Sequence, residues 1–431
     1  MKSDNNQNII SFSNFAKINP FRKIPNGKEV KFVSMEDVEA GRKFVTRYSI
    51  REFKGGSKFR NGDTLMARIT PSLEHGKTAF VKFLNEGEVG GGSTEFIVLS
   101  NREGVSLSEY VYYLAISSII REPAIKSMSG TSGRQRVDPD IFEQIQVPAP
   151  DLDEQQAIVK ILSDLDEKIE LNNQMNKTLE DIEQAIFKRW FVDFEFPNEN
   201  GKPYKSSGGE MVESELGMIP KGWEVQKLGD LISLDKGLSY KGKFLAQEGD
   251  GNVLINLGCI KPGGGFLSNG IKYYNGKFNK NHIVRSGDVV VANTDITQKR
   301  EILGSPVIIP NRFSKNIILF THHLYAMRLS NKEELSFVFF LMQTQRYRDQ
   351  VTSYATGTTV LAIPKEAILD FKFVFPDINV LRKFNDLSQL IFNEINLISE
   401  TNLLIEKIRD LLLPKLMTGK IRVPLEEQNV Q

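Results

Sequence analysis

The chain has 431 residues, of which 40% are hydrophobic and 25% are charged, and its formal net charge at pH 7 is +1. A chain of this length is too long for one ordinary hydrophobic core and therefore indicates two domains or more. Cys259 is the only cysteine, which excludes an intrachain disulfide and a thiolate metal cluster, and no apolar run reaches the ~18 residues that a membrane span requires.

The charge is unevenly distributed along the chain. Residues 1–150 carry a net charge of +4 and residues 221–376 carry +7, whereas residues 151–220 carry −9 and residues 377–431 carry −1. Basic modules next to acidic segments fit a nucleic-acid-binding protein, because neutralising phosphates supplies much of the affinity for DNA. Chance segregation of charge on a solvated surface explains the pattern equally well. The polar amino terminus lacks the basic-then-apolar layout of a secretory signal, so we expect a cytoplasmic protein with no membrane partner.

Short motifs recur in the two halves of the chain in the same order. The matched segments are 59–67 with 284–292, 129–133 with 356–359, 147–150 with 371–376 and, less closely, 31–35 with 253–257. Gly62-Asp63 and Gly287-Asp288 each stand where a tight turn leads into a strand. One unit of roughly 225 residues therefore occurs twice, and the shared order is stronger support than any one match.

A long helix follows each repeat. No proline or glycine occurs from Asp153 to Phe191, and a second helix is expected from about Asn379 to Leu413. Apolar residues recur every seven residues in both segments, which predicts coiled-coil helices. The predicted buried positions are Ile158, Leu165, Asn172, Leu179 and Ile186 with a second column of Ile161, Met175 and Ile182, and then Phe384, Ile391, Ile398, Ile405 and Leu412 with Leu387 and Ile408.

Neither helix can bury its stripe alone, so we expect the two helices to pack antiparallel against each other. A helix of about 39 residues is ~58 Å long. Modules at its two ends could therefore reach major grooves one or two DNA turns of ~34 Å apart. Asn172 and Lys168, the latter in phase with Glu394, could fix the register, or these polar side chains face solvent.

These repeated segments resemble the specificity subunits of Type I restriction–modification systems. The resemblance rests on residues 219–223 (Ile-Pro-Lys-Gly-Trp) with 228–230 (Leu-Gly-Asp), on 286–290, on 357–364 and on 416–421. Together with the two helices, this ordered set covers nearly the whole chain. One departure is that the first half lacks the opening segment. Ile24-Pro25-Asn26-Gly27 is followed by Lys28 instead of tryptophan, and a step of about 225 residues back from Ile219 ends just before Met1.

The resemblance implies an α/β (α+β) fold with two pseudo-repeated target-recognition domains, joined by two long helices that form an antiparallel coiled coil. The expected domains are 1–150 (first recognition domain), 151–195 (first helix), 196–218 (linker, flexible over 198–215), 219–376 (second recognition domain), 377–423 (second helix) and 424–431 (tail). Each domain would bind one half of a split double-stranded DNA target. The helices would set the gap and dock two modification (methyltransferase) subunits, to which restriction subunits add. S-adenosylmethionine, ATP and magnesium would bind to these partners, and this chain would hold no cofactor.

The chain contains only incomplete versions of catalytic motifs. Asn19-Pro20-Phe21 lacks the second proline of the loop that holds a flipped adenine in methyltransferases. Gly237 with Gly242-Lys243-Phe244, and Gly76-Lys77-Thr78, each miss one residue of a P-loop. His322-His323 has no third ligand at metal-binding spacing. We therefore expect no enzyme. A methyltransferase with its own recognition domain would need the missing loop, whereas a stand-alone methyltransferase-associated adaptor, or a coiled-coil interaction protein without a DNA role, remains an alternative.

Basic and amide side chains near the repeated motifs are the candidates for contact with DNA, because Arg and Lys suit guanine or phosphate and Asn and Gln suit adenine. The candidates in the first half are Arg42, Lys43, Lys54, Lys58, Arg68, Arg134, Gln135 and Arg136. The candidates in the second half are Lys272, Tyr273, Tyr274, Asn275, Lys277, Asn293, Thr294, Gln298, Lys299, Arg300, Thr358 and Thr359. The alternative for each is an ordinary residue of a solvated loop, because residues of these types are common in surface loops.

Overall fold

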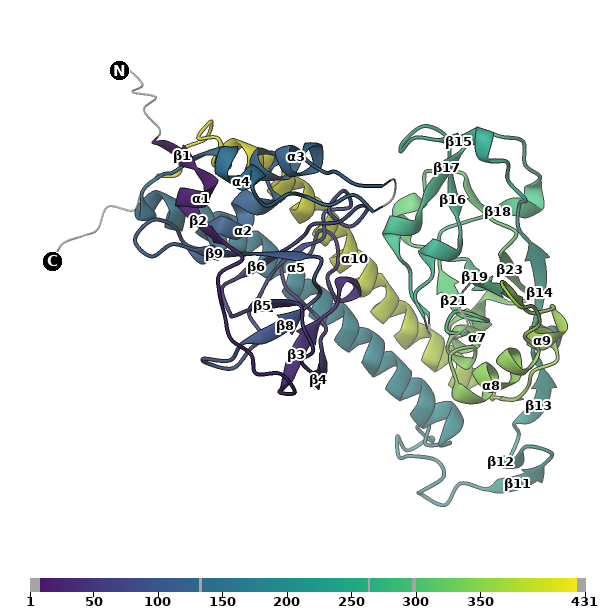
Figure 1. The fold of residues 1–431 in the computed structure, drawn as a ribbon. Helices are drawn as coiled ribbons and strands as arrows, with labels where there is room; N and C mark the ends of the chain where they lie inside the picture. Colours follow the sequence, from purple (N-terminus) through teal and green to yellow (C-terminus); the bar gives the residue numbers. More distant parts are fainter. Residues whose placement is uncertain (1–7, 132–133, 263, 297–299, 425–431) are drawn as a thin grey trace. The chain divides into compact units, whose positions relative to one another are not determined.

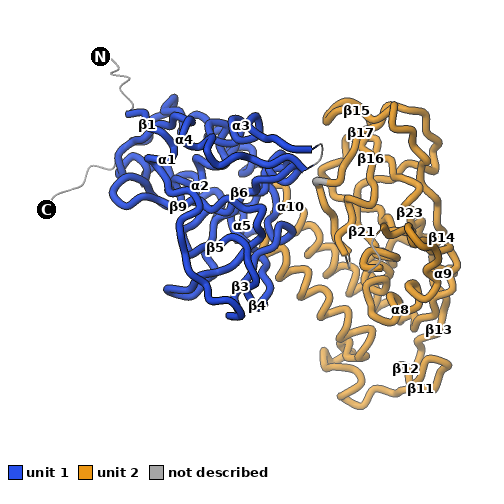
Figure 2. The backbone as a smooth tube through the Cα atoms, in the orientation of Figure 1, with its two compact units in different colours: residues 1–172, 401–431 blue, residues 173–400 orange. Residues whose placement is uncertain are grey.

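The chain divides into two compact units, and each unit contains part of both long helices. The computed structural model describes residues 8–131, 134–262, 264–296 and 300–424. Residues 1–172 with 401–431 form the first unit and residues 173–400 form the second (Figure 2). The division therefore falls inside the helices.

The first unit holds two four-stranded sheets. Its strands are β1 (Ile9–Ser11), β2 (Ala16–Ile18), β3 (Glu29–Val33), β4 (Ser49–Glu52), β5 (Ser57–Phe59), β6 (Thr64–Ala67), β7 (Thr78–Phe80), β8 (Gly90–Gly92), β9 (Phe96–Asn101) and β10 (Gln146–Pro148). The sheets have the orders β2-β9-β6-β7 and β4-β3-β8-β5, and β1 pairs with β10. The short helices are α1 (Phe12–Phe15), α2 (Ser108–Ile116), α3 (Ser118–Lys126) and α4 (Ile141–Gln144) (Figure 1).

The second unit repeats this plan. Its main strands are β13 (Glu224–Lys227), β14 (Ile232–Lys236), β15 (Leu245–Ala246), β16 (Asn252–Ile255), β17 (Lys272–Tyr274), β18 (Ile283–Val284), β19 (Val289–Ala292), β20 (Thr294–Asp295), β21 (Pro306–Ile308), β22 (Ile318–Phe320), β23 (Leu324–Leu329), β24 (Leu361–Ala362) and β25 (Lys372–Phe375). The sheets have the orders β14-β23-β19-β21 and β15-β17-β16-β22-β18. The short helices are α6 (Leu228–Leu231), α7 (Leu335–Leu341), α8 (Gln345–Ser353) and α9 (Glu366–Leu369).

The internal repeat expected from the sequence is confirmed strand by strand. Each unit has one parallel strand pair at the equivalent place, β3 with β8 and β16 with β22. The two Gly-Asp turns are also equivalent, because Gly62 and Gly287 have φ angles of +88° and +86°. Asp63 accepts a hydrogen bond from the backbone amide of Arg60, and Asp288 accepts one from that of Arg285. The two units are therefore two copies of one fold.

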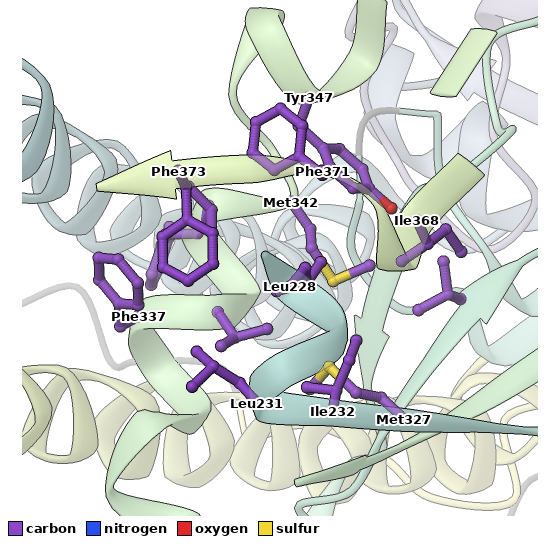
Figure 3. Close-up of a cluster of buried hydrophobic side chains, with 14 of the residues drawn as sticks. Leu228, Leu231, Ile232, Met327, Phe337, Met342, Tyr347, Ile368, Phe371 and Phe373 are labelled. Carbon is purple, nitrogen blue, oxygen red and sulfur yellow. The ribbon is translucent and has the colours of Figure 1, made fainter. Parts of the chain in front are cut away.

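Each unit has its own hydrophobic core. In the first unit the helix α2 supplies a buried run from Tyr110 to Ala115 that packs on the sheet β2-β9-β6-β7. In the second unit, side chains from α6, β14, β23 and α7 meet those of α9 and β25. Figure 3 shows Leu228, Ile232, Met327 and Met342 in this cluster, and the ring centroids of Phe337 and Phe373 lie 5.7 Å apart. These cores hold the strands whose connecting loops are described below.

The two long helices are α5 (Leu152–Phe187), which ends in a π-helical turn over Lys188–Val192, and α10 (Ile378–Met417). They pack antiparallel in both units. Residues with higher sequence numbers on α5 contact residues with lower sequence numbers on α10. In the first unit Asp166 pairs with Arg409 and Asn172 with Asn402; in the second, Glu183 accepts a hydrogen bond from Ser388. The expected antiparallel coil is therefore confirmed.

The first column of the predicted helix stripe is buried or partly buried, whereas the second is correct only for Ile161 and Leu387, which are partly buried. Ile158, Asn172 and Phe384 are buried as expected, but Met175, Ile182 and Ile408 are 41%, 45% and 49% exposed. The second buried column instead consists largely of polar residues, among them Glu183, Ser388, Asn402 and Arg409. A search for apolar residues at heptad spacing cannot find such a column, because its members look like surface residues.

The polar residues that were expected to fix the register divide into two kinds. Asn172 is buried and its amide donates to the side-chain oxygen of Asn402 at 2.7 Å. Lys168 and Glu394 are exposed and face solvent. Only Asn172 therefore fits the register hypothesis.

The segment expected to be a flexible link contains regular structure. Strands β11 (Met211–Ser214) and β12 (Gly217–Pro220) form a hairpin. Phe196 stacks on Tyr204 and on Trp223, with ring centroids 4.5 and 4.8 Å apart. Gly and Ser residues there form turns whose ends are held by this aromatic stack, which a composition-based reading of the segment cannot reveal.

Candidate nucleic-acid interface

In the first unit a hairpin folds back onto the end of the central strand β6. Ser129 and Arg136 form a β-bridge with backbone hydrogen bonds of 3.1 and 2.9 Å, and Arg136 also bridges to Ile69. The amide of Val137 donates to the carbonyl of Arg68 at 2.8 Å. We call residues 129–136 the first recognition hairpin; Ser132 and Gly133 within it lie outside the described residues.

The second unit has the same arrangement. Thr356 bridges to Ala362, and β24 pairs with β20, which directly follows the central strand β19. The amide of Ile363 donates to the carbonyl of Asn293 at 2.9 Å. Residues 356–362 are therefore the second recognition hairpin, equivalent to the first.

A third segment joins each site, and the sequence did not point to it. The loop Ser93–Glu95 connects β8 to β9, and the loop Thr321–His323 connects β22 to β23. The carbonyl of Glu95 accepts from the amide of Arg68 at 2.9 Å, and that of His323 accepts from the amide of Asn293 at 3.0 Å. These connecting loops carry no repeated motif, so only the strand pairing reveals their position.

The first site is held by an ion pair. Arg136 donates from Nε and from one Nη to the carboxylate of Glu95, with distances of 2.6 to 3.1 Å. The hydrogen bond from Arg136 holds the pKa of Glu95 below its ordinary value. Arg134 is exposed on the same hairpin, and Gln135 is tied by its backbone to Thr70.

The second site carries hydroxyl, imidazole and amide groups. The hydroxyl of Thr294 and Nδ1 of His323 are 2.9 Å apart, and the rings of His322 and His323 lie 3.9 Å apart. Burial, followed by the neighbouring His322 and Lys236, lowers the pKa of His323 from its ordinary value. The side-chain amide of Asn293 donates from Nδ2 to the backbone carbonyl of His322 at 3.1 Å.

Three of the predicted DNA contacts are buried. Lys43 has a side chain that is 1% exposed, and its amine pairs with Glu109 at 2.6 Å. Tyr274 and Asn293 are each 3% exposed. Because these side chains are enclosed by their own unit, they offer no surface to DNA, and we assign them structural roles.

The remaining candidates of the first unit lie away from the hairpin, with the exception of Arg68. Arg42 pairs with Glu39 and Glu170, and Lys54 is highly exposed. Lys58 lies on β5, and its amine is 5.6 Å from the ring centroid of Phe53. The guanidinium of Arg68 donates to the carbonyl of Val137 at 3.3 Å, so it folds against the base of the hairpin.

The second unit divides its candidates between two places. Thr294, Thr358 and Thr359 belong to the recognition hairpin and its pairing strand, and Arg300 follows β20 and donates to the carbonyl of Thr352. Lys272, Tyr273, Asn275 and Lys277 lie on or just after β17, in the other sheet. Gln298 and Lys299 lie outside the described residues.

A pocket of about 300 Å³ borders the connecting loop of the first unit. Ser93 and Thr94 line it together with Phe32 and Arg51, whose guanidinium carbon lies 3.3 Å from the centre of the Phe32 ring. The connecting loop therefore lines this pocket through Ser93 and Thr94 and contacts the hairpin through Glu95.

The incomplete catalytic motifs have structural partners. The amine of Lys77 donates to the carbonyl of Met35 at 2.8 Å, and the side-chain oxygen of Asn19 accepts from the amide of Val98 at 2.9 Å. Within the residues that the structure describes, no group of three or more His, Cys, Asp and Glu side chains is arranged to hold a metal ion. A search of the same residues finds no helix that is long and apolar enough to span a membrane.

Known proteins resemble this chain as follows. Residues 13–181 match the family described as Type I restriction modification DNA specificity domain. The chain is 28% identical over 328 residues to the Type I restriction enzyme MjaIX specificity subunit of Methanocaldococcus jannaschii, which covers 75% of this chain and 71% of that protein. It is 33% identical over 202 residues to the HindI specificity subunit of Haemophilus influenzae, covering 46% of this chain and 42% of that protein.

A crystal structure of a Type-I restriction-modification system S subunit from M. genitalium overlaps 97% of this chain and 98% of its own, with 14% identity and a TM-score of 0.48. The match of residues 13–181 and the sequences of the relatives carry the similarity. Residues 13–181 thus match the Type I restriction modification DNA specificity domain, and about three quarters of the chain is similar to a Type I restriction enzyme specificity subunit.

Proposed function

We propose that this chain binds a split double-stranded DNA target through its two units and carries no catalytic site of its own. The observation that carries the proposal is the equivalence of the two recognition sites. In each unit a hairpin, the end of the central strand and a connecting loop meet through the same backbone hydrogen bonds. Two copies of one site in one chain suit a target of two separate half-sites.

The side chains on this shared backbone differ between the units. The first site presents Arg134, Arg136 and Glu95, whereas the second presents Thr294 and His323. Direct base recognition depends on the donors and acceptors that enter the major groove. The two half-sites should therefore differ in sequence, and the target should not be a palindrome.

An exposed row of leucines on α10 supports a role in assembly. Leu390, Leu397, Leu404 and Leu411 recur every seven residues and are 59 to 69% exposed. Because the helix pair already buries another face of α10 in each unit, the leucines of each unit, Leu390 with Leu397 in the second and Leu404 with Leu411 in the first, suit a further helix from a partner protein. We assign it to the modification subunits, of which two would bind, with restriction subunits joining that core. Methyl donor, ATP and magnesium would then belong to these partners.

The leucine row makes a direct test possible. Leu404→Glu should reduce co-purification with the modification subunits, because it places a charge in the middle of the proposed contact. Lys407→Glu changes an exposed position of the same helix and is the control. Unchanged co-purification of the Leu404 variant would remove the docking assignment.

The central experiment compares the purified chain alone with the chain plus its modification subunits. The lone chain should bind duplex DNA but transfer no methyl group from S-adenosylmethionine, and the mixture should methylate at a split motif. Methylation by the lone chain would overturn the non-catalytic assignment. Absence of DNA binding by both preparations would instead favour a coiled-coil interaction protein.

A further inference from the structure

The backbone around Arg136 is fixed on two sides. Its amide and carbonyl both pair with Ser129, and it bridges to Ile69 at the end of the central strand. The next residue, Val137, is buried and donates to the carbonyl of Arg68. Arg136 is thus a hairpin residue whose Cα position is set by the core of its unit, unlike Arg134 nearer the tip.

The guanidinium of Arg136 is fixed as well. Nε and one Nη donate to the two oxygens of Glu95, at 2.9 Å from Nε to Oε2 and 2.6 Å from Nη2 to Oε1. Glu95 is itself held, because its carbonyl accepts from the amide of Arg68 and its own amide donates to Ser93. The carboxylate of Glu95 therefore lies along the Nε–Nη2 edge of the guanidinium. The Nη1–Nη2 edge at the far end remains, and its two outward N–H groups form an end-on fork of donors.

An end-on fork of two N–H donors matches the O6 and N7 acceptors of guanine in the major groove. We propose that Arg136 recognises a guanine in the half-site bound by the first unit and that Glu95 positions its guanidinium for this contact. This inference rests on the proposed DNA-binding function. It adds the identity of one base and a positioning residue that contacts the arginine and not the DNA.

The equivalent position in the second unit differs. Ala362 occupies the place of Arg136, because it bridges to Thr356 as Arg136 bridges to Ser129. The connecting loop there carries His323 in place of Glu95. The arginine–glutamate pair is therefore a feature of the first unit, and its effect should be confined to one half of the target.

The test uses the full chain in complex with its modification subunits. Duplexes carrying the wild-type motif are compared with duplexes in which each guanine is replaced in turn, and methylation rates are measured. Arg136→Lys keeps the charge but lacks the fork, so it should still bind DNA. Its preference for one guanine in one half-site should fall by roughly tenfold or more.

The variant Glu95→Gln should weaken the same preference at the same base pair, and it should have no further effect when combined with Arg136→Lys. Arg134→Ala, on the same hairpin, is the matched control and should leave the base preference at that position intact. If the Arg136→Lys complex keeps the full preference at every guanine, the inference is wrong. If the wild-type complex methylates no split motif, the proposed function itself fails.

Discussion

Glu183 provides a sharp test of the helix packing in the second unit. Its carboxyl is buried between α5 and α10 and accepts a hydrogen bond from Ser388. Burial, with the nearby Glu180, raises the pKa of Glu183 from 4.5 to about 7. A shift of this size corresponds to about 3 kcal/mol of differential interaction between the protonated and ionised forms.

The direction in which stability changes with pH follows from proton binding. Between pH 4.5 and about 7 the folded state binds the proton that the unfolded state has released. The contribution of Glu183 to the free energy of unfolding should therefore be largest below pH 4.5, fall as the pH rises through this window, and level off above it. The variant Glu183→Gln removes the ionisable group but keeps an oxygen that accepts from Ser388. It should be about 3 kcal/mol more stable than the wild type at pH 8 and nearly equal to it below pH 4.5.

The assay is denaturant unfolding followed by tryptophan fluorescence. Trp190 and Trp223 are the only tryptophans, and both lie in the second unit, so the emission reports on the unit that contains Glu183. Asp181→Asn, at an exposed residue of the same helix, is the control. A stability difference between the wild type and Glu183→Gln that does not change between pH 5 and pH 8 would refute the reasoning.

The remaining predictions concern stability and are each checked by denaturant unfolding. Asp166→Ala should destabilise the first unit by up to roughly 3–5 kcal/mol, because the buried guanidinium of Arg409 loses its buried carboxylate and keeps the exposed one of Asp410, and the hydroxyl of Tyr113 loses its acceptor; a loss below 1 kcal/mol would contradict this. Gly287→Ala should cost the second unit about 1 kcal/mol. Its φ of +86° strains any L side chain although space is open around it. Gly242→Ala, which also faces open space but without a positive φ, should be nearly neutral, and equal losses for the two glycines would exclude backbone strain as the cause.

The repeat and the helices were predictable because they depend on local patterns. Gly62-Asp63 and Gly287-Asp288 specify a tight turn through the glycine, and the long run without proline or glycine specifies α5. The second buried column between the two long helices, which is largely polar, was not predictable. Glu183 and Ser388 are polar, so their burial depends on each other across two helices that are far apart in the sequence.

The recognition site was predictable only in part. The motif ahead of Arg134 and Arg136 recurs near Thr358, and the structure places the two motifs in equivalent hairpins. Lys43 was misjudged because a sequence cannot show that its amine is enclosed with Glu109. Glu95 and His323 were missed because they follow short strands in loops without a motif, and they reach the hairpins only through strand pairing.

The most direct test of the central claim is methylation-sensitive long-read sequencing of DNA from cells that carry this gene with its modification partners, and from cells in which it is deleted. A non-palindromic split motif should be methylated in the first culture and unmethylated in the second, and re-expression of the chain should restore it. Absence of such a motif, or a motif that persists after the deletion, would contradict the assignment of this chain as the subunit that selects the DNA sequence.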